Sequence, residues 1–286
     1  MGRNVPPRSD DLVLICTDMD RTLLPNGRQP ESPEARPAFA RVAARPEVTL
    51  AYVTGRHLQL ALEAVHHYAL PEPDYFATDV GSMIYRRVNG EWQAWDAWQQ
   101  DIAPAWNGLE SGDLKPLFAN FSELSDQPDE CQNRFKLSYF VDHGAAIPRL
   151  LETMRLRLAP EGIDAELIYS HDETTNTHLL DVLPTGASKL HAVLFLRDSL
   201  GLATENVLFA GDSGNDLDAL TGPAPAVLVA NASESVRSEA SMLAARRGTQ
   251  NRLYFARGGL AGMNGNYAAG ILEGLVHFHP AAKLWL

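Results

Sequence analysis

The sequence is poor in cysteine, in long apolar runs and in positive charge. Its 286 residues include two cysteines, Cys16 and Cys131, which are too few for a disulfide framework or a cysteine-based zinc site. No apolar run approaches the roughly 20 residues that a membrane-spanning helix needs. Residues 1–11 are polar and proline-bearing, which indicates a flexible leader rather than a signal peptide. We therefore expect a cytoplasmic protein with no membrane partner.

The shortage of positive charge narrows the choice of partners. The chain has 36 acidic and 24 basic residues, and its net charge is -12. Nucleic-acid binding is disfavoured, because proteins of that class usually present a basic surface. An acidic protein that handles an anionic substrate must gather positive charge, or a metal ion, at the site itself.

The chain does contain a repeated alternation of short apolar strands and helices. Strands are predicted over 12–17, 48–53, 75–78, 207–210 and 226–229. Helices are predicted over 33–45, 58–68, 188–200, 216–220, 234–245 and 267–278. This order predicts an α/β fold in which a parallel, Rossmann-like sheet is joined by crossover helices.

The middle of the chain interrupts this alternation. Asn89-Gly90 predicts a hairpin, and further strands are expected over 135–141, 165–169 and 178–183, with helices near 114–124 and 147–158. We expect an inserted α+β unit over 83–184. Residues 1–82 and 185–286 are then expected to form the core domain.

Polar residues follow the predicted core strands where those strands end. Asp18 and Asp20 come directly after the first strand, and alternate residues of an extended strand point the same way. Ligands of open α/β sheets bind at the carboxyl ends of strands. Two close carboxylates need a cation between them, unless one is protonated. The remaining candidates near these ends are Thr54, Lys189, Asp212, Ser213, Asn215 and Asp216.

This set of side chains suits phosphoryl transfer. Mg²⁺ prefers oxygen ligands such as the carboxylates of Asp18 and Asp212, and it would offset the charge of the transferred group. An aspartate can attack phosphorus to give an acyl phosphate. A second carboxyl can protonate the leaving alcohol and then deprotonate a water. Lysine and threonine can hold the remaining oxygens.

Four motifs, in order, are similar to those of haloacid dehalogenase-like (HAD-like) phosphatases: DMDRT at 18–22, YVTGR at 52–56, Lys189, and GDSGND at 211–216. The insert between the second and third motifs resembles an α/β (C2-type) cap. The segments EPDYFATDVGSMIY, FKLSYFVD, LLDVLP and GILEGLVHF further resemble sucrose-phosphate phosphatases. The resemblance covers nearly the whole chain after residue 11.

The resemblance implies roles for the residues that match the motifs. Asp18 is expected to be the nucleophile, Asp20 the general acid and base, and Thr54 a ligand of the phosphoryl group. Lys189 is expected to hold Asp18 and the phosphoryl charge. The residues expected to hold or orient Mg²⁺ or the phosphate are Asp18, the main-chain carbonyl of Asp20, Gly55, Asp212, Ser213, Asn215 and Asp216.

The implied substrate is a sugar phosphate, in the first place sucrose 6-phosphate. The alternatives are another sugar phosphate, such as kanosamine 6-phosphate or a glycosyl-polyol phosphate, and a non-catalytic protein that binds a sugar phosphate or a glycosyltransferase. Candidate sugar contacts in or beside the cap are Asp79, Lys136, Asn176 and Asp181, although Lys136 could equally face water. We expect a monomer or small homo-oligomer, with a sugar-phosphate glycosyltransferase as a possible partner.

The sequence departs from the family pattern at three places. Arg21 stands where related enzymes more often have a small or amide residue, and it could contact the substrate or face solvent. Asp79 stands where sucrose-phosphate phosphatases tend to have an uncharged residue, and an acid is found there in the branch acting on kanosamine 6-phosphate. The segment SHDETTNT at 170–177 is longer than expected. Arg56 is interpreted as a structural partner near the site.

Overall fold

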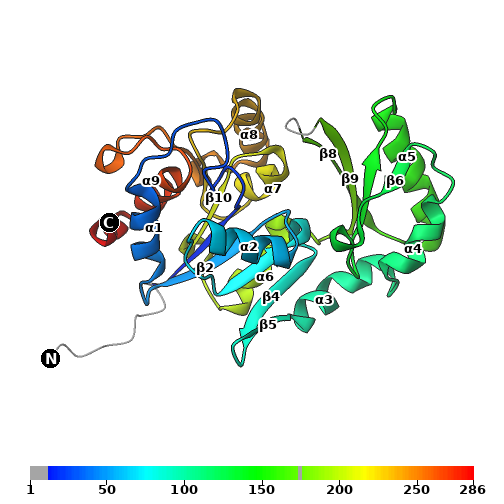
Figure 1. The fold of residues 1–286 in the computed structure, drawn as a ribbon, viewed down its shortest axis with the longest axis horizontal. Helices are drawn as coiled ribbons and strands as arrows, with labels where there is room; N and C mark the ends of the chain where they lie inside the picture. The colour runs from blue at the N-terminus through cyan, green and yellow to red at the C-terminus, as the bar shows by residue number, and fades with distance from the viewer. Residues whose placement is uncertain (1–11, 173–175) are drawn as a thin grey trace.

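Two β-sheets organise the molecule, which is a computed structural model that describes residues 12–172 and 176–286. The larger sheet has eight strands in the order β12-β11-β10-β1-β2-β3-β4-β5, and the smaller has four in the order β6-β7-β9-β8 (Figure 1). The leader expected at 1–11, and residues 173–175 of the expected insert, lie outside the described residues. The two sheets confirm the predicted α/β fold with a second α+β unit.

The first six strands of this order, from β12 to β3, run parallel. They are β1 (Val13–Thr17), β2 (Val48–Val53), β3 (Tyr75–Thr78), β10 (Val207–Gly211), β11 (Ala226–Leu228) and β12 (Leu253–Phe255). β1 lies between β10 and β2, and all five of its residues are buried. A parallel sheet with both faces covered requires such a continuous apolar strand, which is what the first strand's sequence supplies.

Helices cover both faces of this sheet. They are α1 (Ala35–Ala43), α2 (Leu58–His67), α6 (Lys189–Ser199), α7 (Leu217–Leu220), α8 (Glu234–Arg247) and α9 (Ala268–Phe278). Alternate residues of β1 divide between two cores: Leu14 and Cys16 belong to one buried cluster, and Val13 and Ile15 to the other. The first motif, which begins at Asp18, therefore follows a strand whose position is fixed by packing on both faces.

The smaller sheet faces the core domain, and its helices lie on the far side (Figure 1). Its strands are β6 (Leu124–Asp126), β7 (Leu137–Val141), β8 (Ala165–Asp172) and β9 (Thr177–Pro184). The helices α4 (Ser111–Phe118) and α5 (Ile147–Leu158) cover its outer face, and α3 (Asp96–Ile102) leads to it from the core. We refer to these elements together as the cap.

The structure differs from the sequence prediction at several elements. The sequence places the hairpin of β4 (Met83–Val88) and β5 (Glu91–Ala94) in the insert, but the hairpin pairs antiparallel with β3 and extends the core sheet. We therefore propose that the cap begins after Ala94. Helix α4 ends at Phe118, short of the predicted 114–124, and the three-residue strands β6 and β12 were not predicted. Three residues are too few to show a hydrophobic period.

Two further features bear on the position of the cap. Trp98 of α3 donates its indole N–H to the carbonyl oxygen of Gly81, at 3.1 Å, and so ties the cap's first helix to the end of β3. Trp98 and Trp106 are fully buried, as packing residues would be.

Within the described residues, no helix is both long enough and apolar enough to cross a membrane.

Candidate active site

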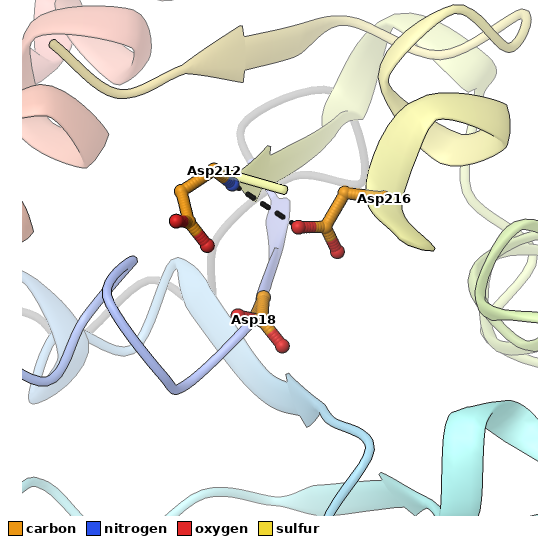
Figure 2. Close-up of side chains that lie close together, drawn as sticks. All are labelled: Asp18, Asp212 and Asp216. Atoms are coloured by element: carbon orange, nitrogen blue, oxygen red, sulfur yellow. Dashed lines mark hydrogen bonds between the residues drawn. The ribbon is translucent and has the colours of Figure 1, made fainter. Parts of the chain in front are cut away.

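Three buried aspartates meet where β1 and β10 end (Figure 2). Asp18 follows β1, Asp212 follows β10, and Asp216 closes the turn Gly214–Asp216 just beyond. One carboxylate oxygen of each lies within 4.8 Å of the others. They meet because β1 and β10 pair in parallel, so that residues far apart in sequence leave the sheet side by side.

Lys189 joins this group as its buried counter-charge. Its ammonium group donates to Asp18 Oδ1 at 2.7 Å, to Asp216 Oδ1 at 2.7 Å and to Asn215 Oδ1 at 3.1 Å. Burial opposes its charge, but the neighbouring carboxylates raise the pKa of Lys189 above its ordinary value. Lys189 is therefore a cation at neutral pH, and it fixes one oxygen of Asp18.

The backbone of Lys189 is held by a turn that follows β3. Gly81 has φ +105°, and a Cβ atom there would lie 2.5 Å from the carbonyl carbon of Ser188 and 2.9 Å from the amide nitrogen of Lys189. Only glycine allows this close approach. Ser188 in turn caps α6 by accepting from the amide of His191. The end of β3 thus positions a lysine that lies more than a hundred residues later in the chain.

Asp216 has a different role from its two neighbours. Its Oδ2 accepts from the amides of Asp212 and Ser213 and from the Ser213 hydroxyl, each at 3.1 Å, while Oδ1 accepts from Lys189. It packs against Gly211, where a Cβ atom would lie 2.6 Å from the Asp216 Cβ. Both oxygens of Asp216 are therefore engaged in holding the loop and the lysine.

Asp18 and Asp212 keep oxygens that a cation could use. Burial, followed by the charge of Asp216, raises the pKa of Asp212 to about 7, and burial also raises the pKa of Asp18. Asp212 Oδ2 is buried and accepts no hydrogen bond, while Oδ1 accepts from Thr22 at 3.2 Å. Hard oxygen donors and a buried carboxylate oxygen that accepts no hydrogen bond together fit a divalent ion such as Mg²⁺.

Asp20 lies outside this carboxylate group and is held by two other side chains. The Arg56 guanidinium donates to it twice, from Nε at 2.7 Å and from Nη2 at 2.6 Å, and Asn26 donates at 2.7 Å. Burial raises the pKa of Asp20, but these bonds outweigh burial and the pKa is lowered overall. The sequence indicated that Arg56 pairs near the site, but only the fold identifies Asp20 as its partner.

Thr54 and Gly55 directly follow β2, at the same carboxyl ends of the central strands. Thr54 is fully buried, and its hydroxyl oxygen accepts from the Arg56 amide at 3.2 Å, which leaves its hydroxyl hydrogen available. A Cβ atom at Gly55 would meet only Val80, at 4.0 Å. Ser213 and Asn215 bond to one another at 3.0 Å beside Lys189. The core residues singled out from the sequence thus lie together at the carboxyl ends of the central strands.

The candidate sugar contacts divide into a cluster of three, which joins Asp79 of the core to two cap residues, and one separate residue. Lys136 is buried and donates to the carbonyl oxygen of Cys131 at 2.8 Å; its nitrogen lies 3.5 Å from Asp181 and 3.9 Å from Asp79. Burial raises the pKa of Asp79, against the opposing charge of Lys136. Asn176 lies in the turn between β8 and β9, five residues from Asp181, which is roughly 16 Å along a strand.

The parallel sheet, the carboxylates at its strand ends, the buried lysine and the inserted cap together define a HAD-like phosphatase. The sequence confirms this class and narrows it. Residues 11–279 match the model of the sucrose-6F-phosphate phosphohydrolase family, so the chain belongs to that family. The protein is therefore a phosphoric monoester hydrolase that acts on a sugar phosphate.

Three individual similarities illustrate the family. The chain is 45% identical to a HAD-like hydrolase of Nitrosococcus oceani over 96% of this chain and 74% of that protein. It is 33% identical to a glucosylglycerol-phosphate synthase of Pseudomonas anguilliseptica over 93% of this chain, but it spans only 31% of that protein. The sucrose-phosphatase of Synechocystis sp., solved with sucrose and phosphate, has 26% identity and a TM-score of 0.71, and the match covers 93% of this chain and 97% of that one.

Proposed function

We propose that this protein is a Mg²⁺-dependent phosphatase that hydrolyses sucrose 6-phosphate to sucrose and phosphate, through a phosphorylated Asp18. The observation that carries the proposal is the Asp18 carboxylate, which a buried lysine orients beside a second carboxylate that has one oxygen without a hydrogen bond. A protein that only binds a sugar phosphate needs no oriented nucleophile. The complete set of motif residues therefore favours an enzyme over a non-catalytic relative.

The chemistry follows from the positions of four side chains. Lys189 holds Oδ1 of Asp18, so the other oxygen attacks phosphorus and the sugar alkoxide leaves. Asp20 in its protonated form gives that alkoxide a proton and, as the carboxylate that Arg56 stabilises, later removes one from the water that hydrolyses the acyl phosphate. The Thr54 hydroxyl donates to the phosphoryl oxygens, and the charge of Lys189 stabilises them as negative charge spreads over the group.

Mg²⁺ would be held by Asp18, Asp212 and the main-chain carbonyl of Asp20. Asp216 and Asn215 orient this site, because their oxygens already accept hydrogen bonds from the loop and from Lys189. When bound, the ion supplies positive charge to the transferred group. The chain's own contribution is to keep the three aspartates close together and shielded from water.

Support for the substrate comes from the family and from the cap. The sheet of the cap faces the core, and the cluster that Lys136 and Asp181 of the cap form with Asp79 of the core offers donors and acceptors for sugar hydroxyls. One lysine between two carboxylates leaves a net negative charge, which favours a second candidate, an amino sugar phosphate such as kanosamine 6-phosphate. The Pseudomonas anguilliseptica relative is a glucosylglycerol-phosphate synthase. This similarity makes glucosylglycerol phosphate, a glycosyl-polyol phosphate, a further candidate substrate and a glycosyltransferase a candidate partner.

A phosphate-release assay over a panel of sugar phosphates tests this proposal. We expect the highest kcat/KM with sucrose 6-phosphate, and a loss of at least about 100-fold after EDTA treatment that added Mg²⁺ restores, because the carboxylates otherwise repel the substrate. A higher kcat/KM with kanosamine 6-phosphate or a glycosyl-polyol phosphate would show that this compound, and not sucrose 6-phosphate, is the preferred substrate. If no member of the panel is hydrolysed, the proposal is wrong.

The contact between Arg56 and Asp20 gives a second prediction, which depends on the leaving group. We expect Arg56→Gln to lower turnover of the sugar phosphate by about 10- to 100-fold, because Asp20 loses the fork that orients it for proton transfer. p-Nitrophenyl phosphate releases a stable anion that needs no proton, so its pre-steady-state release of p-nitrophenolate, which precedes the water step that also uses Asp20, should fall less than about threefold. Arg56→Lys keeps the positive charge but cannot make the paired Nε and Nη2 hydrogen bonds to Asp20, so it is the matched control. Equal losses on both substrates would contradict this role.

A further inference from the structure

Arg21 touches the oxygen of Asp212 that is free to bind a metal ion. Its Nε lies 3.3 Å from Asp212 Oδ2, which is buried and accepts no hydrogen bond. The two side chains differ in exposure, since 45% of the Arg21 side chain is exposed but only 2% of that of Asp212. The guanidinium therefore reaches from the solvent side onto a carboxylate inside the proposed metal site.

The backbone of Arg21 is fixed even though its side chain is half exposed. Its φ is +58°, in the left-handed region. Its amide donates to Asn26 Oδ1 at 2.8 Å, and its carbonyl oxygen accepts from Asn231 at 2.6 Å. Asn231 is buried and also accepts from the amide of Tyr267 at 2.8 Å. Any movement of the guanidinium must therefore come from rotation of the side chain, because the main chain is held at both ends.

We propose that Arg21 is an internal competitor for the metal ion: its guanidinium neutralises Asp212 and must leave Oδ2 when a divalent ion binds there. This inference rests on the metal site of the proposed function. Two cations cannot share one carboxylate oxygen without strong repulsion at such distances. Arg21 therefore weakens Mg²⁺ binding and keeps the ion exchangeable. By the reciprocity of linked equilibria, Mg²⁺ in turn releases the guanidinium.

Calorimetric titration of EDTA-treated, dialysed protein with Mg²⁺ tests the competition without any activity measurement. We expect Arg21→Gln to bind Mg²⁺ about two- to fivefold more tightly than the wild type, the range for a partly exposed ion pair. Arg21→Asn should do the same, and it guards against misfolding because asparagine tolerates positive φ. Arg28→Gln is the matched control: Arg28 is exposed, lies in the same loop, and makes no hydrogen bond or ion pair with the described residues.

Thermal unfolding of the same proteins gives a second measurement. Metal-free Arg21→Gln should unfold at a lower temperature than the wild type, because Asp212 loses its counter-charge, and Mg²⁺ should raise its midpoint by more. Affinity that is unchanged or weaker in both Arg21 variants, or tightened equally by Arg28→Gln, would overturn the inference alone. A wild type that takes up no Mg²⁺ would overturn the inference together with the metal site of the proposed function.

Discussion

Asp18→Asn should abolish phosphatase activity, lowering kcat by about four orders of magnitude or more, the scale seen when a nucleophile is removed. The amide is nearly the same size as the carboxylate, so the site keeps its shape. It is a poor nucleophile, and no neighbouring group replaces it: Asp216 is engaged through both oxygens, and Asp212 lies at the end of the next strand. Single-turnover phosphate release measures the loss.

The same variant should remain folded. Lys189 loses its charged partner at Asp18 but keeps Asp216 at 2.7 Å, and one of three mutually repelling buried carboxylates is removed. We expect its thermal midpoint to lie close to that of the wild type. Asp198→Asn on the exposed end of α6 serves as the control, with full activity. Activity of Asp18→Asn comparable with the control would remove Asp18 as the nucleophile.

The core sheet could be predicted from the sequence because the two patterns that indicate it, short apolar strands and the motifs at their ends, are local. Strands such as β1 and β10 are short apolar runs, and each ends at aspartates that the HAD-like motifs share. The order of strands and helices then implies a parallel sheet, and a parallel sheet brings these ends together. The proximity of Asp18 and Asp212 follows from topology alone, without knowledge of any side-chain conformation.

The features that were not predicted depend on packing between distant segments. The contact of Gly81 with Ser188 joins the end of β3 to the start of α6, and no local pattern marks it. The fork of Arg56 on Asp20 depends on rotamers, as does the approach of Arg21 to Asp212. The β4–β5 hairpin is predicted as a hairpin within the insert, whereas it pairs with β3 of the core, because a turn signal such as Asn89-Gly90 specifies the turn and not the strand with which the hairpin pairs.

Lys189→Met should damage both stability and catalysis. The ammonium group is fully buried and is the only lysine or arginine group in contact with Asp18 among the described residues. Its removal leaves uncompensated buried carboxylates, a change that typically costs about 3–5 kcal/mol of unfolding free energy. Turnover should also fall by about 10³-fold or more, because Asp18 loses the bond that orients it and the phosphoryl group loses a cation. Denaturant unfolding and single-turnover assays measure the two effects.

The response to Mg²⁺ separates the electrostatic role of Lys189 from simple packing. If the loss of stability in Lys189→Met comes from unpaired carboxylates, saturating Mg²⁺ should restore part of it, because the ion supplies positive charge to the same group of carboxylates. A packing defect would give no such recovery. Lys115→Met is the matched control, since Lys115 pairs with Asp126 at 2.7 Å on the exposed surface of the cap, and its unfolding midpoint should not change. Full activity in folded Lys189→Met would show that Asp18 needs no lysine to orient it.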